Sequence, residues 1–130
     1  MPENALSEPL QLPSFAPSAK VAVIGASGGI GAAFASDLAT CASVAQVYRL
    51  SRTANESPAP DSLPLDLADE RSIERAAIAL KSTVGSLDMV IVATGLLHEP
   101  GGLQPEKSWR NLDAAALEKT FRINTIGPTM

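Results

Sequence analysis

The feature that most constrains this chain is a glycine-rich segment between an apolar run and an amphipathic stretch. Residues 20–25 (KVAVIG) are mostly apolar and end at glycine, which is typical of a buried strand. Four glycines fall within residues 25–31, and residues 29–42 repeat apolar side chains at helical spacing. Glycines in this position permit a tight turn and a close backbone approach to a phosphate, which the helix N-terminus attracts. The segment predicts a dinucleotide-binding turn; the alternative is a glycine-rich turn without a ligand.

The rest of the chain alternates apolar runs with helical periodicities. We expect further strands at residues 44–50, 63–67 and 87–93, and helices that begin after the capping residues Asp69 and Asp113. Strands separated by helices of this length predict an α/β fold of Rossmann type, a doubly wound parallel sheet. The same periodicities predict which side chains face the core: Ile30, Ala33, Phe34, Leu38 and Cys41 in the first helix, and Leu117 and Phe121 in the last.

Composition excludes several other classes of function. The formal net charge of −4 argues against binding to nucleic acid or to an anionic membrane surface. One cysteine and one histidine cannot make a metal site of several such ligands, so we expect no metal. Residues 1–19 hold four prolines and no lysine or arginine, unlike a secretion or transit signal. We therefore expect a cytoplasmic protein with a flexible lead-in (1–19) and one domain (20–130).

The spacing Gly25-x-x-x-Gly29-x-Gly31 resembles that of the short-chain dehydrogenase/reductase family. The resemblance covers residues 20–130, and residues 93–98 and 105–107 look in particular like the C-factor type of that family. It implies a sheet with strand order 3-2-1-4 and a nicotinamide cofactor held by the turn. The residues of the turn that it places at the cofactor are Gly25, Ser27, Gly28, Gly29, Ile30 and Gly31.

The end of the second expected strand indicates which cofactor is used. In dinucleotide folds an acidic residue about 20 positions after the glycines usually holds the adenosine ribose. Here the sequence is Leu50-Ser51-Arg52-Thr53, without a carboxylate. Arg52 and Ser51 can hydrogen-bond the additional phosphate of NADP, which a carboxylate would repel. The sequence therefore predicts NADP(H) rather than NAD(H); the alternative is that Arg52 is a solvated loop charge.

Two further segments match the family's cofactor site. By resemblance, the Asp66 carboxylate accepts from the adenine amino group and the Leu67 N–H donates to the ring, although Asp66 could instead simply form a turn. Ala93, Thr94 and Gly95 end the fourth strand, where the resemblance places the cofactor. The family usually has Asn-Asn-Ala-Gly where this chain has Val92-Ala93-Thr94-Gly95, so Gly95 is retained and the asparagines are not.

The segment from Asn124 to Pro128 resembles the family's asparagine segment, which makes Asn124 the expected catalytic residue. A buried amide needs hydrogen-bond partners. Pro128 has no N–H with which to bond the Asn124 carbonyl, so we expect that carbonyl to be freed and the helix to kink at Gly127-Pro128. In the family the freed carbonyl holds a water linked to the catalytic lysine. The alternative is an ordinary kinked helix end.

The family's proton donor lies in a Tyr-x-x-x-Lys motif after this asparagine, and these 130 residues do not contain it. The only tyrosine, Tyr48, has Arg52 four residues on. We therefore expect a truncated NADP(H)-dependent oxidoreductase acting on a small carbonyl or alcohol substrate, inactive by itself and a homo-oligomer only at full length. A non-catalytic NADP-binding or interaction module and a nonfunctional fragment are the alternatives.

Overall fold

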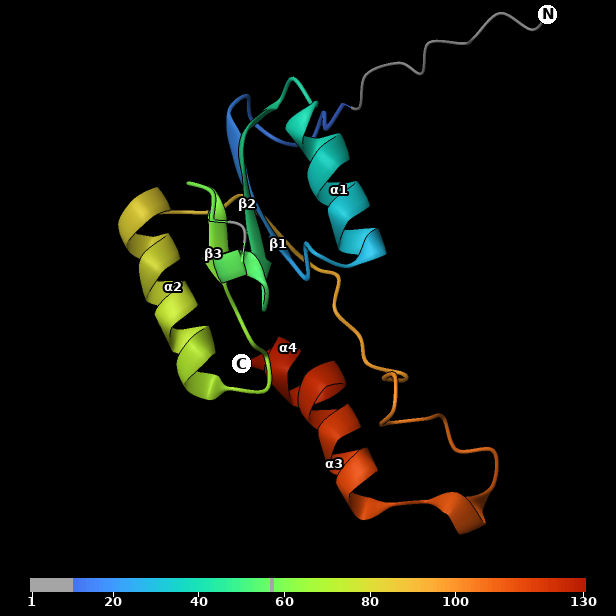
Figure 1. Cartoon of the computed structure of the whole chain (residues 1–130). Helices are drawn as coiled ribbons and strands as arrows, with labels where there is room; N and C mark the ends of the chain where they lie inside the picture. The colour runs from blue at the N-terminus through green and yellow to red at the C-terminus, as the bar shows by residue number, and fades with distance from the viewer. Residues whose placement is uncertain (1–10, 57) are drawn as a thin grey trace, which may run out of the picture.

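A four-stranded parallel sheet forms the centre of the structure, a computed structural model that describes residues 11–56 and 58–130 (Figure 1). The strands lie in the order β3-β2-β1-β4, and all neighbouring pairs are parallel. This confirms the expected doubly wound sheet and its strand order. The strands are β1 (Ala19–Ile24), β2 (Val44–Ser51), β3 (Ser62–Pro64) and β4 (Met89–Val92).

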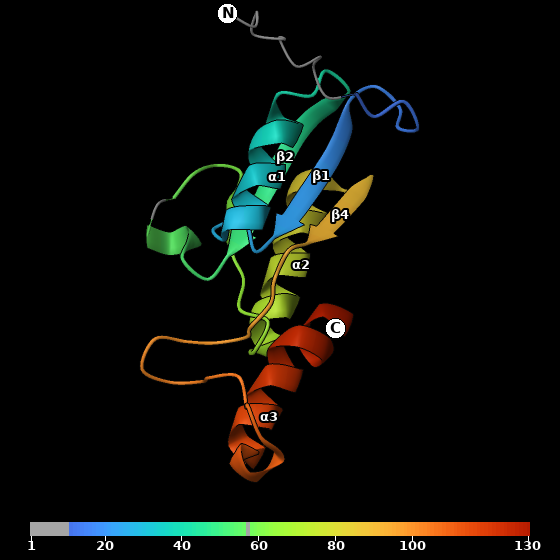
Figure 2. The same ribbon diagram turned by 90° about the vertical axis from the view of Figure 1, so that its right-hand side faces the viewer.

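Two helices cover opposite faces of this sheet, α1 (Gly29–Ala39) and α2 (Glu70–Val84) (Figure 1). Because successive side chains of a strand point to opposite faces, β1 contributes to both sides of the core. Val21 and Val23 pack with Leu38 of α1, whereas Ala22 packs with Ala76 of α2. Figure 2 shows β4 beside β1 at the edge of the sheet.

The buried face of α1 differs from the predicted one. Leu38 and Cys41 are buried as expected, but Ile30 is 71% exposed, and Ala33 and Phe34 are exposed as well. The buried residues of α1 are Gly31, Ala35 and Leu38.

Gly31 explains this rotation of α1. A Cβ at Gly31 would lie 2.1 Å from the carbonyl oxygen of Gly25, so the helix rests directly on the backbone of the turn before it. Only glycine allows that contact, because any side chain would clash with the carbonyl. The contact fixes which residues face inward, and it leaves Ile30 on the solvent side.

Capping side chains begin the later helices as predicted. The Asp69 carboxylate accepts a hydrogen bond from the Arg71 N–H at 3.0 Å, and the Asp113 carboxylate accepts from the Ala116 N–H at 2.9 Å. The third strand is shorter than the expected 63–67 and ends at Pro64. Short 3₁₀ turns occupy two connections, η1 (Ala54–Glu56) and η2 (Trp109–Asn111).

The last helix remains helical through Gly127 and Pro128, where we expected a kink. It comprises α3 (Ala114–Phe121), a π-helical segment η3 (Arg122–Ile126) and α4 (Gly127–Thr129). In η3 the Gly127 N–H donates to the carbonyl of Arg122, five residues earlier. A π-helical turn therefore directly precedes the proline, which cannot donate, and the chain stays helical past it.

This C-terminal helix lies beyond the carboxyl ends of the strands (Figures 1 and 2). Its contact with the segment after β3 involves backbone: a Cβ at Gly127 would lie 2.6 Å from the carbonyl oxygen of Leu67. The Arg122 guanidinium adds a hydrogen bond to the Ala68 carbonyl at 3.3 Å. Phe121, predicted to face inward, is 60% exposed, because the helix uses its other side for these contacts.

Replacing Gly127 by alanine should destabilise the protein. The added methyl group would push the helix away from Leu67, and such overpacking typically costs about 1–3 kcal/mol, more than the helix propensity that alanine contributes. Urea unfolding followed by circular dichroism measures the change. Gly29→Ala is the matched control, since a Cβ at Gly29 meets nothing within 4 Å. Equal stability of the two variants would contradict the proposed contact.

Candidate functional site

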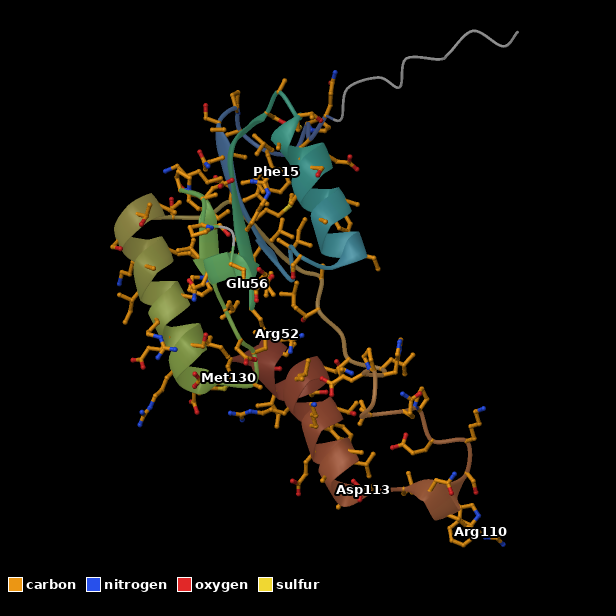
Figure 3. All side chains as sticks on the ribbon, viewed as in Figure 1. Phe15, Arg52, Glu56, Arg110, Asp113 and Met130 are labelled. Atoms are coloured by element: carbon orange, nitrogen blue, oxygen red, sulfur yellow. The ribbon has the colours of Figure 1, made fainter. Side chains whose placement is uncertain are left out.

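A cleft of about 190 Å³ opens at the carboxyl ends of β1, β2 and β4. Its walls come from the turn after β1, the end of β2, and the segments that follow β3 and β4, and Ile123 of the C-terminal helix adds to them. Ligands of open parallel sheets bind at this edge, where connections leave for opposite faces. Figure 3 labels Arg52 at this end of the sheet, on the side where the C-terminal helix lies.

Most of the residues predicted for the cofactor site line this one cleft: Gly25, Ser27, Gly28, Ser51, Arg52, Asp66, Leu67, Ala93, Thr94 and Gly95. Gly29, Ile30 and Gly31 do not line the cleft, because they form the first turn of α1. Gly31 packs under the glycine turn (residues 25–28), and Ile30 faces solvent. The sequence prediction missed Ile24, Leu65, Leu96 and Ile123. All four are sequence neighbours of predicted residues, which is the one signal that could have found them.

The backbone of Gly25, which follows β1, contacts β2 and the segment after β4 at the base of the cleft. Its φ of +86° lies in the left-handed region, and a Cβ there would be 2.7 Å from the Ala93 carbonyl oxygen. Its N–H donates to the carbonyl of Leu50 at 2.8 Å. Glycine is therefore required here both by conformation and by the close approach of the segment after β4.

The turn leads directly into the N-terminus of α1. Gly28 is the capping residue and provides no side-chain hydrogen bond to the helix. Its own N–H donates to the Gly25 carbonyl at 3.0 Å. The helix thus begins beside the cleft without a side-chain cap and with no acidic residue in its first turn. This arrangement favours an anionic group at the helix N-terminus.

Ser51 and Arg52 lie where β2 ends. The Ser51 hydroxyl is 3.5 Å from that of Thr53, and the Arg52 side chain is exposed. Within residues 11–56 and 58–130, Arg52 forms no ion pair. Asp61, on the connection to β3, is paired with Arg49. Among the described residues, the positive charge of Arg52 at the mouth of the cleft is therefore not held in an ion pair.

Asp66 forms a turn, which the sequence analysis gave as the alternative to adenine binding. Its carboxylate accepts a hydrogen bond from the Ala68 N–H at 2.9 Å, and its own N–H donates to the Ser72 hydroxyl at 3.0 Å. This turn-forming role engages one carboxylate oxygen, Oδ1. A carboxylate has further lone pairs, so turn formation and ligand binding are compatible.

Asn124 does not line the cleft but holds a segment that does. Its amide oxygen accepts from the Leu96 N–H at 2.6 Å, and its amide nitrogen donates to the Leu96 carbonyl at 2.8 Å. Asn124 is exposed, not buried as the sequence analysis assumed, and its amide nevertheless has both partners. These two bonds tie the C-terminal helix to the chain leaving β4.

The structure also bears on metals and membranes. In the described part of the chain, no three His, Cys, Asp or Glu side chains are grouped as a metal site would require. No helix in that part has the length and apolar character of a membrane-spanning helix.

Comparison with known proteins places the fold in a family. Residues 19–130 match the family model described as short chain dehydrogenase. An alignment over 65 residues, which covers 46% of this chain and 21% of the other protein, shows 42% identity to the short chain dehydrogenase pigC of Monascus ruber.

Solved structures show the same fold at low sequence identity. An NADPH-bound carbonyl reductase from chicken fatty liver matches with a TM-score of 0.71 and 22% identity, over 88% of this chain and 45% of its own. A dehydrogenase/reductase from Sinorhizobium meliloti matches with a TM-score of 0.69 and 23% identity, over 88% of this chain and 47% of its own. The chain thus spans less than half the length of these proteins. With its fold, its glycine turn and a family match from residue 19 to residue 130, it belongs to the short chain dehydrogenase family.

Proposed function

We propose that this chain binds NADP(H) in the cleft and provides the cofactor-binding half of an oxidoreductase. The main support for this proposal is that the glycine turn, the Ser51-Arg52 pair and the Asp66-Leu67 turn line one cleft. The matched carbonyl reductase from chicken was solved with NADPH bound, which supports a nicotinamide cofactor. The reaction proposed for the whole protein is hydride transfer between the nicotinamide and a small carbonyl or alcohol substrate.

The chain's own residues fit the parts of such a cofactor. The bare backbone at Gly25 and Gly28 allows a pyrophosphate to approach the N-terminus of α1, where unpaired N–H groups favour it. At the end of β2, Arg52 and Ser51 can donate to the phosphate that distinguishes NADP from NAD. No carboxylate at that strand end opposes this phosphate.

Asn124 is proposed as the catalytic-site residue that these 130 residues supply. Through Leu96 it fixes the segment after β4 at the cleft. The family's Tyr-x-x-x-Lys is not among these residues, and Tyr48 belongs to β2. Nicotinamide, when bound, supplies or accepts the hydride. Proton transfer is therefore proposed only for a protein that also has the tyrosine and lysine.

Arg52→Ala should weaken NADPH binding while leaving NADH binding about unchanged. A hydrogen bond to a charged group contributes about 1.5–3 kcal/mol, so we expect the dissociation constant for NADPH to rise about tenfold or more. Isothermal titration of the chain with both nucleotides measures this. Arg110→Ala is the control, since Arg110 belongs to η2 and does not line the cleft. Equal weakening for both nucleotides would contradict the NADP assignment, and a folded chain that binds neither would contradict the proposed function.

Asp66→Asn separates the two roles of Asp66. The amide oxygen can still accept from the Ala68 N–H, so stability should be retained. The amide nitrogen, placed at the other position, cannot accept from the adenine amino group. We expect NADPH to bind about tenfold more weakly. The analogue with hypoxanthine in place of adenine lacks that amino group, and its affinity should not fall. A parallel loss for both nucleotides would show that Asp66 only shapes the turn.

A further inference from the structure

One polar atom in the cleft has no protein partner. The hydroxyl oxygen of Thr94 is buried, and within the described residues it neither donates nor accepts a hydrogen bond. Buried hydroxyl groups in folded proteins are nearly always paired, because leaving one unpaired costs free energy. Thr94 is one of the residues that line the cleft, so this buried oxygen belongs to the wall of the proposed cofactor site. The family resemblance places alanine at this position, so the hydroxyl is a feature of this chain.

The backbone around Thr94 holds the side chain in place. The Ala93 N–H donates to the Ile24 carbonyl at 2.8 Å, which continues the pairing of β4 with β1. The Thr94 methyl group packs against the glycine turn: a Cβ at Gly25 would lie 2.8 Å from it. A β-branched side chain has few rotamers, so this methyl contact also restricts where the hydroxyl lies.

The strand order assigns the hydroxyl to one part of a dinucleotide. Ser51, Arg52 and Asp66 follow β2 and β3, on one side of β1, whereas Thr94 follows β4 on its other side. The glycine turn and the N-terminus of α1, which favour a pyrophosphate, come directly after β1 between them. If the adenosine end lies with Arg52 and Asp66, the oxygens within reach of Thr94 belong to the half of the dinucleotide past the pyrophosphate.

We propose that the Thr94 hydroxyl donates a hydrogen bond to a phosphate or ribose oxygen on the nicotinamide side of NADP(H). This makes Thr94 a cofactor-binding residue through its side chain, and the inference rests on the proposed function. It accounts for a buried donor that the protein itself does not satisfy.

Thr94→Val tests this assignment, because valine keeps the shape and removes the hydroxyl. We expect the dissociation constant for NADPH to rise about tenfold, as for loss of a hydrogen bond to a charged or strongly polar group. Binding of 2′,5′-ADP, which has only the adenosine half, should not change. Thr94→Ser keeps the hydroxyl and should bind NADPH close to the wild type. Equal affinity of Thr94→Val and the wild-type chain for NADPH, or an equal loss for 2′,5′-ADP, would overturn the proposal.

The stability of the ligand-free chain provides an independent readout. Since the hydroxyl is unpaired, Thr94→Val should have a melting temperature equal to or above that of the wild type. The increase in melting temperature that saturating NADPH produces should nevertheless be smaller than in the wild type. A lower melting temperature without ligand would show that the hydroxyl serves the fold. If the wild-type chain fails to bind NADPH, the proposed function fails as well; if it binds and Thr94→Val binds equally, only the Thr94 inference fails.

Discussion

Direct packing of backbone against backbone at the glycine turn is the constraint on which the rest of the structure depends. A side chain at Gly25 would meet the Ala93 carbonyl, and one at Gly31 would meet the carbonyl of Gly25. With both positions bare, β1, β4 and the start of α1 approach more closely than side chains allow. This approach gives α1 its rotation and places its N-terminus at the cleft. The same lack of side chains leaves room for a ligand. The glycines therefore determine both the packing of these elements and the shape of the cleft.

Much of this arrangement could be predicted from the sequence, because local patterns decide it. Glycine spacing located the turn, apolar runs located the strands, and Asp69 and Asp113 located two helix starts. The chain order of strands and helices then left a doubly wound parallel sheet as the fold, and the family resemblance supplied the order of its strands. Segments that follow the strands gather at one edge of such a sheet. The cleft could therefore be assembled from segments far apart in the chain.

What the sequence did not predict depends on contacts between elements. Apolar periodicity favoured Ile30 as a core residue of α1, but the contact of Gly31 with the turn rotates the helix away from it. In the last helix, Phe121 fits an inward face by spacing, yet the side with Gly127 makes the packing contact. Near Pro128 the sequence did not predict the π-helical turn that precedes this proline. At Gly31 and at Gly127, a small residue that permits close approach outweighed a large apolar one.

The pair of hydrogen bonds between Asn124 and Leu96 closes a stretch of chain in which the bonded residues are 28 positions apart. The entropy of closing such a loop grows slowly with its length, by about 0.6 kcal/mol for each doubling. The loop that precedes α3 can therefore change in length at little cost in closure entropy. The two hydrogen bonds therefore hold both ends of this loop, whatever its length. A protein built this way can change what its outer loop meets while the glycine-lined end of the cleft stays the same.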